Sequence, residues 1–308
     1  MSLTETSERT EVAPKPDVLE TPLGRFIAEY CESKVAIAAA AFLFLLVLLA
    51  IIAPSIAPQN PYDLAQVDVL DSRLPPGEVG FNGMTYWLGS DGAGRDLLSA
   101  MLYGLRISLA VGFLSGLIAM AIGAAVGLVA AYAGGRVETL IMRIVDLQLS
   151  FPAILVALML IAVLGKGVDK IIIALVTVQW AYYARTVRSS ALVERRKEYV
   201  EAARCLGLSH GRIVFRHILP NCLPPLIVVA TVQAAHAIAL EATLSFLGVG
   251  LPQTEPSLGL LISNGFEYVL SGKYWISTFP GIALLVTIVS INLVGDQLRD
   301  VLNPRLKR

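Results

Sequence analysis

Six long apolar stretches, separated by polar segments, dominate the sequence. They cover about 35–56, 107–133, 139–164, 168–187, 223–248 and 279–301. An α-helix rises 1.5 Å per residue, so the 22 residues of the first stretch reach about 33 Å, enough to cross a hydrocarbon core of about 30 Å. The pattern therefore predicts an all-α membrane protein with six transmembrane helices.

Composition supports the membrane class and removes several others. The chain is 56% hydrophobic and only 16% charged, whereas globular proteins are about 25% charged. Its formal net charge is zero, which gives no general attraction for nucleic acid. The three cysteines, Cys31, Cys205 and Cys222, have no metal-ligand spacing, so we expect neither a disulfide framework nor a metal site.

The basic residues predict the orientation. An N-terminus in the cytoplasm places 18 Lys and Arg residues inside and six outside; the six are Arg73, Arg95, Arg106, Lys166, Lys170 and Lys273. The positive-inside rule favours this arrangement, with both termini cytoplasmic. We expect a cytoplasmic segment over 1–34, a first transmembrane helix and outer loop over 35–106, a core domain over 107–301 and a cytoplasmic tail over 302–308. The first apolar stretch starts late and is long, so we expect a retained helix and no cleaved signal peptide.

One large polar loop, 188–222, lies inside in this arrangement. Its residues 198–221 predict two short helices with a bend between them. Gly207 occupies the place of a left-handed C-terminal cap, and Ser209 can cap the second helix. Pro220 should stop or bend that helix before the fifth span.

The first of these short helices is predicted to be amphipathic. Tyr199, Ala202, Ala203 and Leu206 share one face at helical spacing. The two alanines make this face low in relief, so that another protein can approach closely. The alternative is a helix that lies on the membrane surface or packs on the inner ends of the chain's own helices.

The same loop carries a family resemblance. Glu201-Ala202-Ala203, then Gly207, then Leu219-Pro220 resembles the "EAA" loop of bacterial ABC-importer permeases. His217 stands where that pattern has Ile, and the form HILPN is similar to the peptide/nickel branch. The segments 88–106, 241–262 and 295–307 resemble the C-type subunit of dipeptide and oligopeptide permeases, so the likeness covers about 24–308.

The resemblance implies a type I ABC-importer permease fold in the bacterial inner membrane. It implies that the loop couples the permease to the ATPase through Glu201, Ala202, Ala203, Gly207, His217, Leu219 and Pro220. The expected partners are a homologous second permease, two ATPase subunits, a solute-binding protein and membrane lipids. The permease itself would bind no cofactor, because the partner ATPases use the ATP and Mg²⁺.

Polar residues inside the spans are candidates for the solute pathway, because a charge at mid-bilayer costs about 2.5–3.5 kcal/mol. Gln233 and His236 are three residues apart and share a helical face. They could line the path or make structural hydrogen bonds. Glu241 could lie near an outer gate, and Asn292 is a further candidate.

Two glycine patterns need separate interpretations. Gly112, Gly116, Gly123 and Gly127 share one face of the second span, which favours close helix packing within the subunit or with a partner. The glycines at 89, 92 and 94 have no GK[ST] motif and no preceding strand. We therefore expect an ordered loop that enters a helix and reject a phosphate-binding loop.

No catalytic constellation is present in the sequence, so we expect a permease without an ATPase site of its own. The substrate class is open among peptides, nickel chelates, opines and sugars. The rival classes are a secondary transporter, which often has repeated halves and broken helices, and a membrane scaffold that recruits a cytoplasmic partner.

The orientation can be tested with thiol labelling. Single cysteines at Ser72 and Ser271, in a cysteine-free background, should react with an impermeant reagent added outside intact cells, because both positions are in predicted outer loops. Cys205 alone should not react. Labelling of Cys205 from outside would contradict the orientation.

Overall fold

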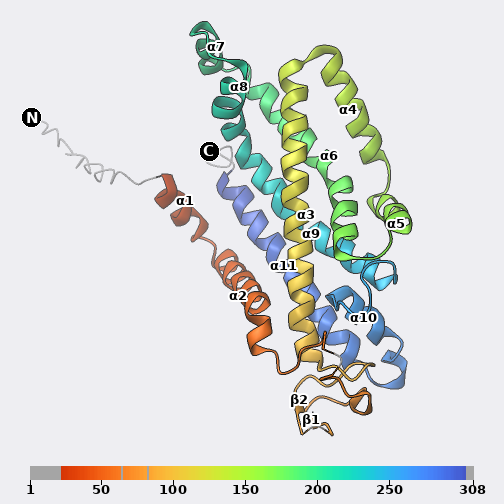
Figure 1. The fold of residues 1–308 in the computed structure, drawn as a ribbon. Coiled ribbons are helices and arrows are strands. Elements are labelled where there is room, and N and C mark those ends of the chain that lie inside the picture. Colours follow the sequence, from red (N-terminus) through yellow and green to blue (C-terminus); the bar gives the residue numbers. More distant parts are fainter. Residues whose placement is uncertain (1–21, 64, 82, 303–308) are drawn as a thin grey trace, which may run out of the picture.

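The computed structural model describes residues 22–63, 65–81 and 83–302. In this part of the chain, long helices form one bundle (Figure 1). The elements that pass along the bundle are α2 (Lys34–Ile56), α3 (Leu97–Ala133), α4 (Gly135–Ser150), α6 (Val168–Glu194), α9 (Leu219–Phe246) and α11 (Trp275–Leu302), while α5 (Ala153–Leu164) lies across its side. The short helix α1 (Pro22–Tyr30) lies beside α11, and the Gln297 Nε2 donates to the Glu29 carbonyl at 3.4 Å. Most of the predicted 1–34 segment and 302–308 tail lies outside the described residues.

The centre of the bundle is the contact between α3 and α6. A Cβ added at Gly123 would lie 2.4 Å from the Trp180 carbonyl oxygen, and one added at Gly127 would lie 2.5 Å from the Ala184 carbonyl oxygen. Only glycine permits this approach, because a methyl group would overlap the backbone of α6. Two of the four glycines on this face therefore pack against α6, and Gly112 packs against Ile238 of α9. Packing within the subunit is confirmed for these three.

The helices are consistent with the six predicted spans, but they do not reproduce that number exactly and they differ at their ends. By length and composition, four helices qualify as spans, and the pair α4 and α5 adds a fifth. The sixth is α6, which carries Gln179, Arg185 and Arg188. It does not meet the same test of length and composition, but it runs beside α3 along the bundle (Figure 1).

The second span begins ten residues before the expected start at 107. Asp96 caps α3, and its Oδ2 accepts hydrogen bonds from the backbone N and the hydroxyl of Ser99, at 2.8 and 2.6 Å. A capping side chain of this kind favours the start of a helix at its own position, whether or not the residues that follow are apolar. The helix α3 therefore extends beyond the apolar stretch by about 15 Å at 1.5 Å per residue.

The third span is not a single helix. α4 and α5 meet at Phe151 and Pro152 with a bend of 90°. Proline lacks a backbone N–H and disfavours helical geometry at the residue before it, so the helix ends there. Broken helices are also a feature of secondary transporters, the rival class, so the break does not distinguish the two classes.

The opposite end of the bundle from α7 carries a small folded unit. It contains a 3₁₀ turn (Val69–Asp71), the antiparallel strands β1 (Glu78–Val79) and β2 (Thr85–Tyr86), and α10 (Leu258–Phe266) with a further 3₁₀ turn (Val269–Ser271). Asp71 is buried and accepts hydrogen bonds from the Phe81 N–H at 2.8 Å and the Tyr86 hydroxyl at 3.1 Å. The loop 89–96 leads into α3, as expected of an ordered loop that enters a helix, but the short strand β2 precedes it, which the sequence did not predict.

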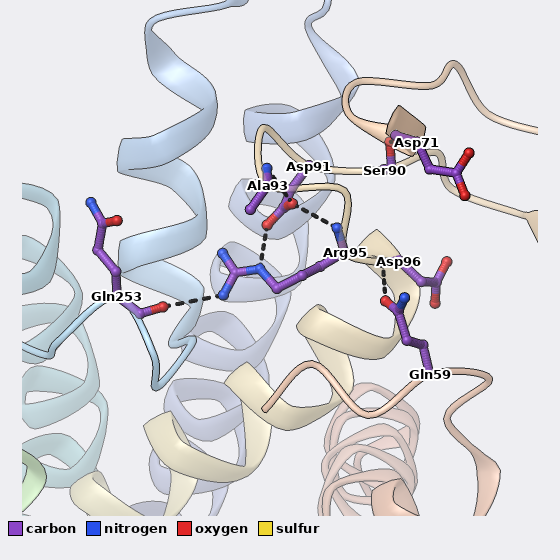
Figure 2. A network of polar contacts seen from close by, with 8 residues as sticks. All are labelled: Gln59, Asp71, Ser90, Asp91, Ala93, Arg95, Asp96 and Gln253. Carbon is purple, nitrogen blue, oxygen red and sulfur yellow. Dashed lines mark hydrogen bonds and ion pairs between the residues drawn. The ribbon is translucent and has the colours of Figure 1, made fainter. Parts of the chain in front are cut away.

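Hydrogen bonds of Arg95 and Asp96 join the loop before α3 to distant segments of the chain. Figure 2 shows Arg95 between Asp91 and Gln253: its Nε lies 2.7 Å from the Asp91 Oδ2, and its Nη1 donates to the Gln253 carbonyl at 3.2 Å. On the other side, the Gln59 Oε1 accepts from the Asp96 N–H at 2.6 Å. Three distant segments of the chain are thereby tied together at the start of α3.

The glycine contacts give a test of the fold. Gly123→Ala should lower the thermal stability of the purified protein, because overpacking against a backbone atom typically costs about 1–3 kcal/mol. Gly116→Ala is the matched control, since its Cβ would meet only the Tyr183 hydroxyl, at 3.6 Å. Melting curves of the detergent-solubilised variants measure the difference. Equal melting temperatures for the two variants would contradict the close packing of α3 on α6.

Candidate functional site: the loop between α6 and α9

The predicted inner loop forms one end of the bundle. α7 (Glu198–Cys205) follows α6 after a short turn, and α8 (His210–Arg212) follows α7. A π-helical segment (Ile213–Ile218) then leads without a break into α9. Figure 1 shows α7 and α8 at the end of the bundle that lies away from α10 and the strands.

Backbone and charge both favour α7 as a separate short helix. Its first turn holds Glu198 and Glu201 and its last turn Arg204, which complements the helix dipole. Gly207 has a φ of +71°, and the Leu208 N–H donates to the Ala203 carbonyl at 3.2 Å. These features form the glycine-terminated cap that was predicted at this position.

The face of α7 that was predicted to be open to another protein is wrong at Ala203. Ala203 is buried and packs with Val200 against the apolar core at the end of the bundle. Ala202 and Leu206 point outward, and Leu206 is 79% exposed. The buried apolar stripe follows Val200 and Ala203, while the surface offered to another protein is Glu198, Glu201, Ala202, Cys205 and Leu206, which we call the α7 surface.

The second helix of the loop also differs from expectation. Ser209 precedes α8 but makes no capping hydrogen bond through its side chain. The helix does not stop at Pro220, which lies in the first turn of α9. Immediately before it, the backbone widens to π geometry, and the Leu219 N–H donates to the Val214 carbonyl. A π segment absorbs a disturbance of the regular hydrogen-bond pattern without ending the helix.

Arginine and histidine side chains fix the loop to α3. The Arg195 Nη1 donates to the carbonyls of Ala131 and Tyr132, at 2.6 and 3.2 Å. These carbonyls belong to the last turn of α3, where the helix has no N–H groups to satisfy them. The Tyr132 hydroxyl bonds the His210 Nδ1. The end of α3 is thus held from both α6 and α8.

A second polar cluster joins α6, α7 and α9. The Tyr199 hydroxyl donates to the Glu194 Oε2 at 2.6 Å and accepts from the Asn221 Nδ2 at 3.2 Å. The Asn221 Nδ2 also donates to the His217 carbonyl at 2.7 Å. Partial burial and then the bond to Glu194 raise the pKa of Tyr199 to about 12, so the hydroxyl stays protonated at neutral pH. Glu194 and Asn221 were not predicted as site residues, and only Asn221 lay inside the recognised HILPN motif.

The structure separates the predicted pathway residues from one another. Gln233 is buried, and its carbonyl accepts from the Gln179 Nε2 at 3.1 Å, whereas His236 is exposed. Their spacing places them near one another on α9, but they do not share one environment. Glu241 is fully buried and accepts from the hydroxyls of Ser108 and Ser245, at 3.0 and 2.8 Å.

Asn292, the fourth of these candidates, lies on the exposed surface of α11. Of the other predicted loop residues, His217 and Leu219 are partly buried and Pro220 is exposed. The loop residues therefore lie close together at one end of the bundle, while the pathway candidates are distributed between its interior and its outer surface.

The burial of the two alanines gives a test of the α7 geometry. Ala203→Leu should lower the thermal stability of the isolated chain, because overpacking a core site costs about 1–3 kcal/mol. Ala202→Leu should change stability by less than about 0.5 kcal/mol, as is usual for exposed positions. Melting of the two variants without any partner measures this. A larger loss for Ala202→Leu would contradict the orientation of α7.

A helical membrane bundle with an irregular polar loop that presents a short helix at one end is the architecture of a transport permease. Comparison with known proteins identifies the particular family. Residues 123–308 match the family model "binding-protein-dependent transport system inner membrane component", and residues 21–76 match the N-terminal transmembrane domain of oligopeptide transport permease C. The chain belongs to the family of binding-protein-dependent transport system inner membrane components.

Relatives extend over almost the whole chain. It is 38% identical to the dipeptide transport system permease protein DppC of Escherichia coli K12, over 98% of this chain and 99% of that protein. It is 36% identical to the di/tripeptide transport system permease protein DppC of Pseudomonas aeruginosa, over 96% and 97%. A putative peptide transport system permease protein of Brucella suis is 43% identical over 86% of each chain.

A solved structure supports the fold. A chain of the MetNI methionine ABC transporter, in an inward-facing conformation, superposes with a TM-score of 0.55 at 23% identity, covering 67% of this chain and 98% of that one. This likeness shows the ABC-importer permease fold that the sequence predicted. The protein is a multi-pass permease component of a binding-protein-dependent transport system.

Proposed function

We propose that this chain is one of two permease subunits of an ATP-driven importer, that peptides are its solutes, and that the α7 surface is where an ATPase docks. The peptide assignment is supported by the names of its relatives in Escherichia coli and Pseudomonas aeruginosa. Nickel chelates, opines and sugars are the alternative solutes of the same importer type.

The observation that carries the docking proposal is the division of α7 into two sides. One side, Val200 and Ala203, is anchored in the core, and the other exposes two acidic groups around a small and an apolar residue. A helix anchored in this way resists separation from the bundle, so a force applied to its exposed side can reach the bundle. Glu201 would meet a basic group of the ATPase in a charge-assisted contact.

Transport follows from this arrangement as alternating access. ATP and Mg²⁺, bound by the two ATPase subunits, close the ATPase dimer; the α7 helices of both permeases move with it, and the pathway between the permeases opens outward. This chain contributes no ATPase site. The solute-binding protein delivers solute at the end that carries α10, which would place α7 and both termini in the cytoplasm.

Two exposed polar residues support a second permease subunit. His236 and Asn292 lie on membrane-spanning helices, yet their side chains are not covered by this chain. Polar side chains within a bilayer normally face protein or water and avoid lipid. A homologous subunit over this surface would cover both residues or enclose them in the solute pathway, with Gln233 and Glu241 in supporting positions behind them.

Glu201→Lys tests the docking role. The substitution should weaken co-purification of the ATPase at least about tenfold, because breaking one partner of a desolvated charge contact typically costs about 2–5 kcal/mol. Peptide uptake in reconstituted vesicles should fall with it. The matched control is Glu267→Lys, an exposed glutamate at the opposite end, which should leave ATPase binding unchanged.

The result that would contradict the proposal is wild-type ATPase binding and uptake in Glu201→Lys. Thermal stability of both variants serves as a check on folding, since neither side chain is part of the core. A uniform loss in both variants would indicate a general effect of charge, and the α7 surface would then have no specific role.

A further inference from the structure

We propose that the hydroxyl group of Tyr199 is a positioning group that joins α7 to both α6 and α9, so that a displacement of α7 is passed directly to the two helices. This inference rests on the proposed function, because it assumes that α7 receives motion from an ATPase. It adds a residue and a route for that motion. The cluster of Tyr199, Glu194 and Asn221 is called the Tyr199 junction below.

The Tyr199 junction is a three-helix contact made by one oxygen atom. That atom bonds the Glu194 carboxylate at the end of α6, at 2.6 Å, and the Asn221 amide at the start of α9, at 3.2 Å. Among the described residues, Tyr199 is the one side chain of α7 for which the structure gives hydrogen bonds to other helices. Val200 and Ala203 add apolar contacts between α7 and the bundle.

Apolar contacts and hydrogen bonds differ in what they transmit. An apolar surface resists separation but is non-directional, so it tolerates sliding. A hydrogen bond has a preferred distance and angle and weakens steeply away from them. The Tyr199 junction therefore fixes the position of α7 along its neighbours, which Val200 and Ala203 alone do not.

The surroundings make the bond to Glu194 strong. Glu194 is only 9% exposed, and its other oxygen lies 2.7 Å from the Lys197 Nζ. A charged acceptor strengthens a hydrogen bond, and a covered position keeps water from competing for it. The Tyr199 hydroxyl is protonated at neutral pH and can donate to this carboxylate.

The covalent route from α7 to α9 is less direct than the Tyr199 junction. It passes through Gly207, the short α8 and the π segment, where the helical hydrogen bonds are irregular. Asn221 lies after all three and bonds the His217 carbonyl of the π segment. A displacement of α7 can thus reach α9 through Tyr199 and Asn221 without first straightening the connecting loop.

Tyr199→Phe tests the Tyr199 junction, because it removes the hydroxyl and keeps the ring. The variant should bind the ATPase as the wild type does, while the ratio of peptide imported to ATP hydrolysed falls several-fold. Tyr182→Phe is the matched control: both tyrosines are 38% exposed, and the structure gives the Tyr182 hydroxyl no bond. The complete importer in vesicles, with uptake and hydrolysis measured together, provides the ratio.

Two variants of Glu194 give an independent measurement. Glu194→Gln keeps an oxygen that can accept from Tyr199, so its ratio of peptide imported to ATP hydrolysed should be higher than that of Glu194→Ala. A merely structural role would lower the stability of both and leave the ratio of import to hydrolysis unchanged. Equal ratios in Tyr199→Phe and the wild type would overturn the proposal, as would a loss of ATPase binding in Tyr199→Phe, which would make Tyr199 part of the docking surface.

The outcomes separate this inference from the proposed function. If Glu201→Lys abolishes ATPase binding while Tyr199→Phe keeps a normal ratio, the docking role stands and the Tyr199 junction is refuted. If Glu201→Lys changes nothing, the docking role of α7 fails whatever Tyr199→Phe does.

Discussion

The close contact between α3 and α6 determines where every other functional element of this permease lies. Gly123 and Gly127 bring the two backbones together, and α6 then leaves the bundle beside the end of α3. Only from this position can Arg195 reach the carbonyls of Ala131 and Tyr132. Glu194, its neighbour in sequence, is thereby held at the start of α7. A larger residue at Gly123 would move the anchor of the loop as well as a pair of helices.

Ionic groups at the α7 end of the bundle are stabilised by partners on adjacent helices. The Arg188 Nε lies 2.8 Å from the Glu138 Oε1, which joins α6 to α4, and the Arg185 Nη2 lies 2.5 Å from the Asp146 Oδ1. α6 continues as a helix to Glu194, seven residues beyond the end that hydropathy predicted, and Arg188 pairs with Glu138 just past that end. A hydropathy profile does not contain information about such pairs between helices.

The sequence predicted the features that depend on local pattern. The lengths of the apolar stretches indicated the membrane-spanning helices. Gly207 indicated the end of α7, because glycine adopts a left-handed backbone at a lower free-energy cost than other residues. Features that depend on contacts between distant residues were missed or misplaced. Ala202 and Ala203 are identical in type, and only the position of the core decides that Ala203 faces inward. The bonds of Tyr199 to Glu194 and Asn221 likewise require that three helices meet. Gln233 is buried because α6 packs on its side of α9, where Gln179 bonds its carbonyl, whereas His236 stays exposed.

The buried pair of Arg95 and Asp91 has a mechanical consequence for the opposite end of the bundle. Arg95 bonds Gln253, and Glu241 accepts from Ser108, so α3, α9 and the segment before α10 are locked to one another by groups that are costly to leave unpaired in the interior. Spreading these segments apart would break the bond from Arg95 to the Gln253 carbonyl and the bond from Ser108 to the buried Glu241 carboxylate. These contacts favour movement of this end as one unit, and in the importer proposed above an opening would then form along the boundary with the second permease subunit.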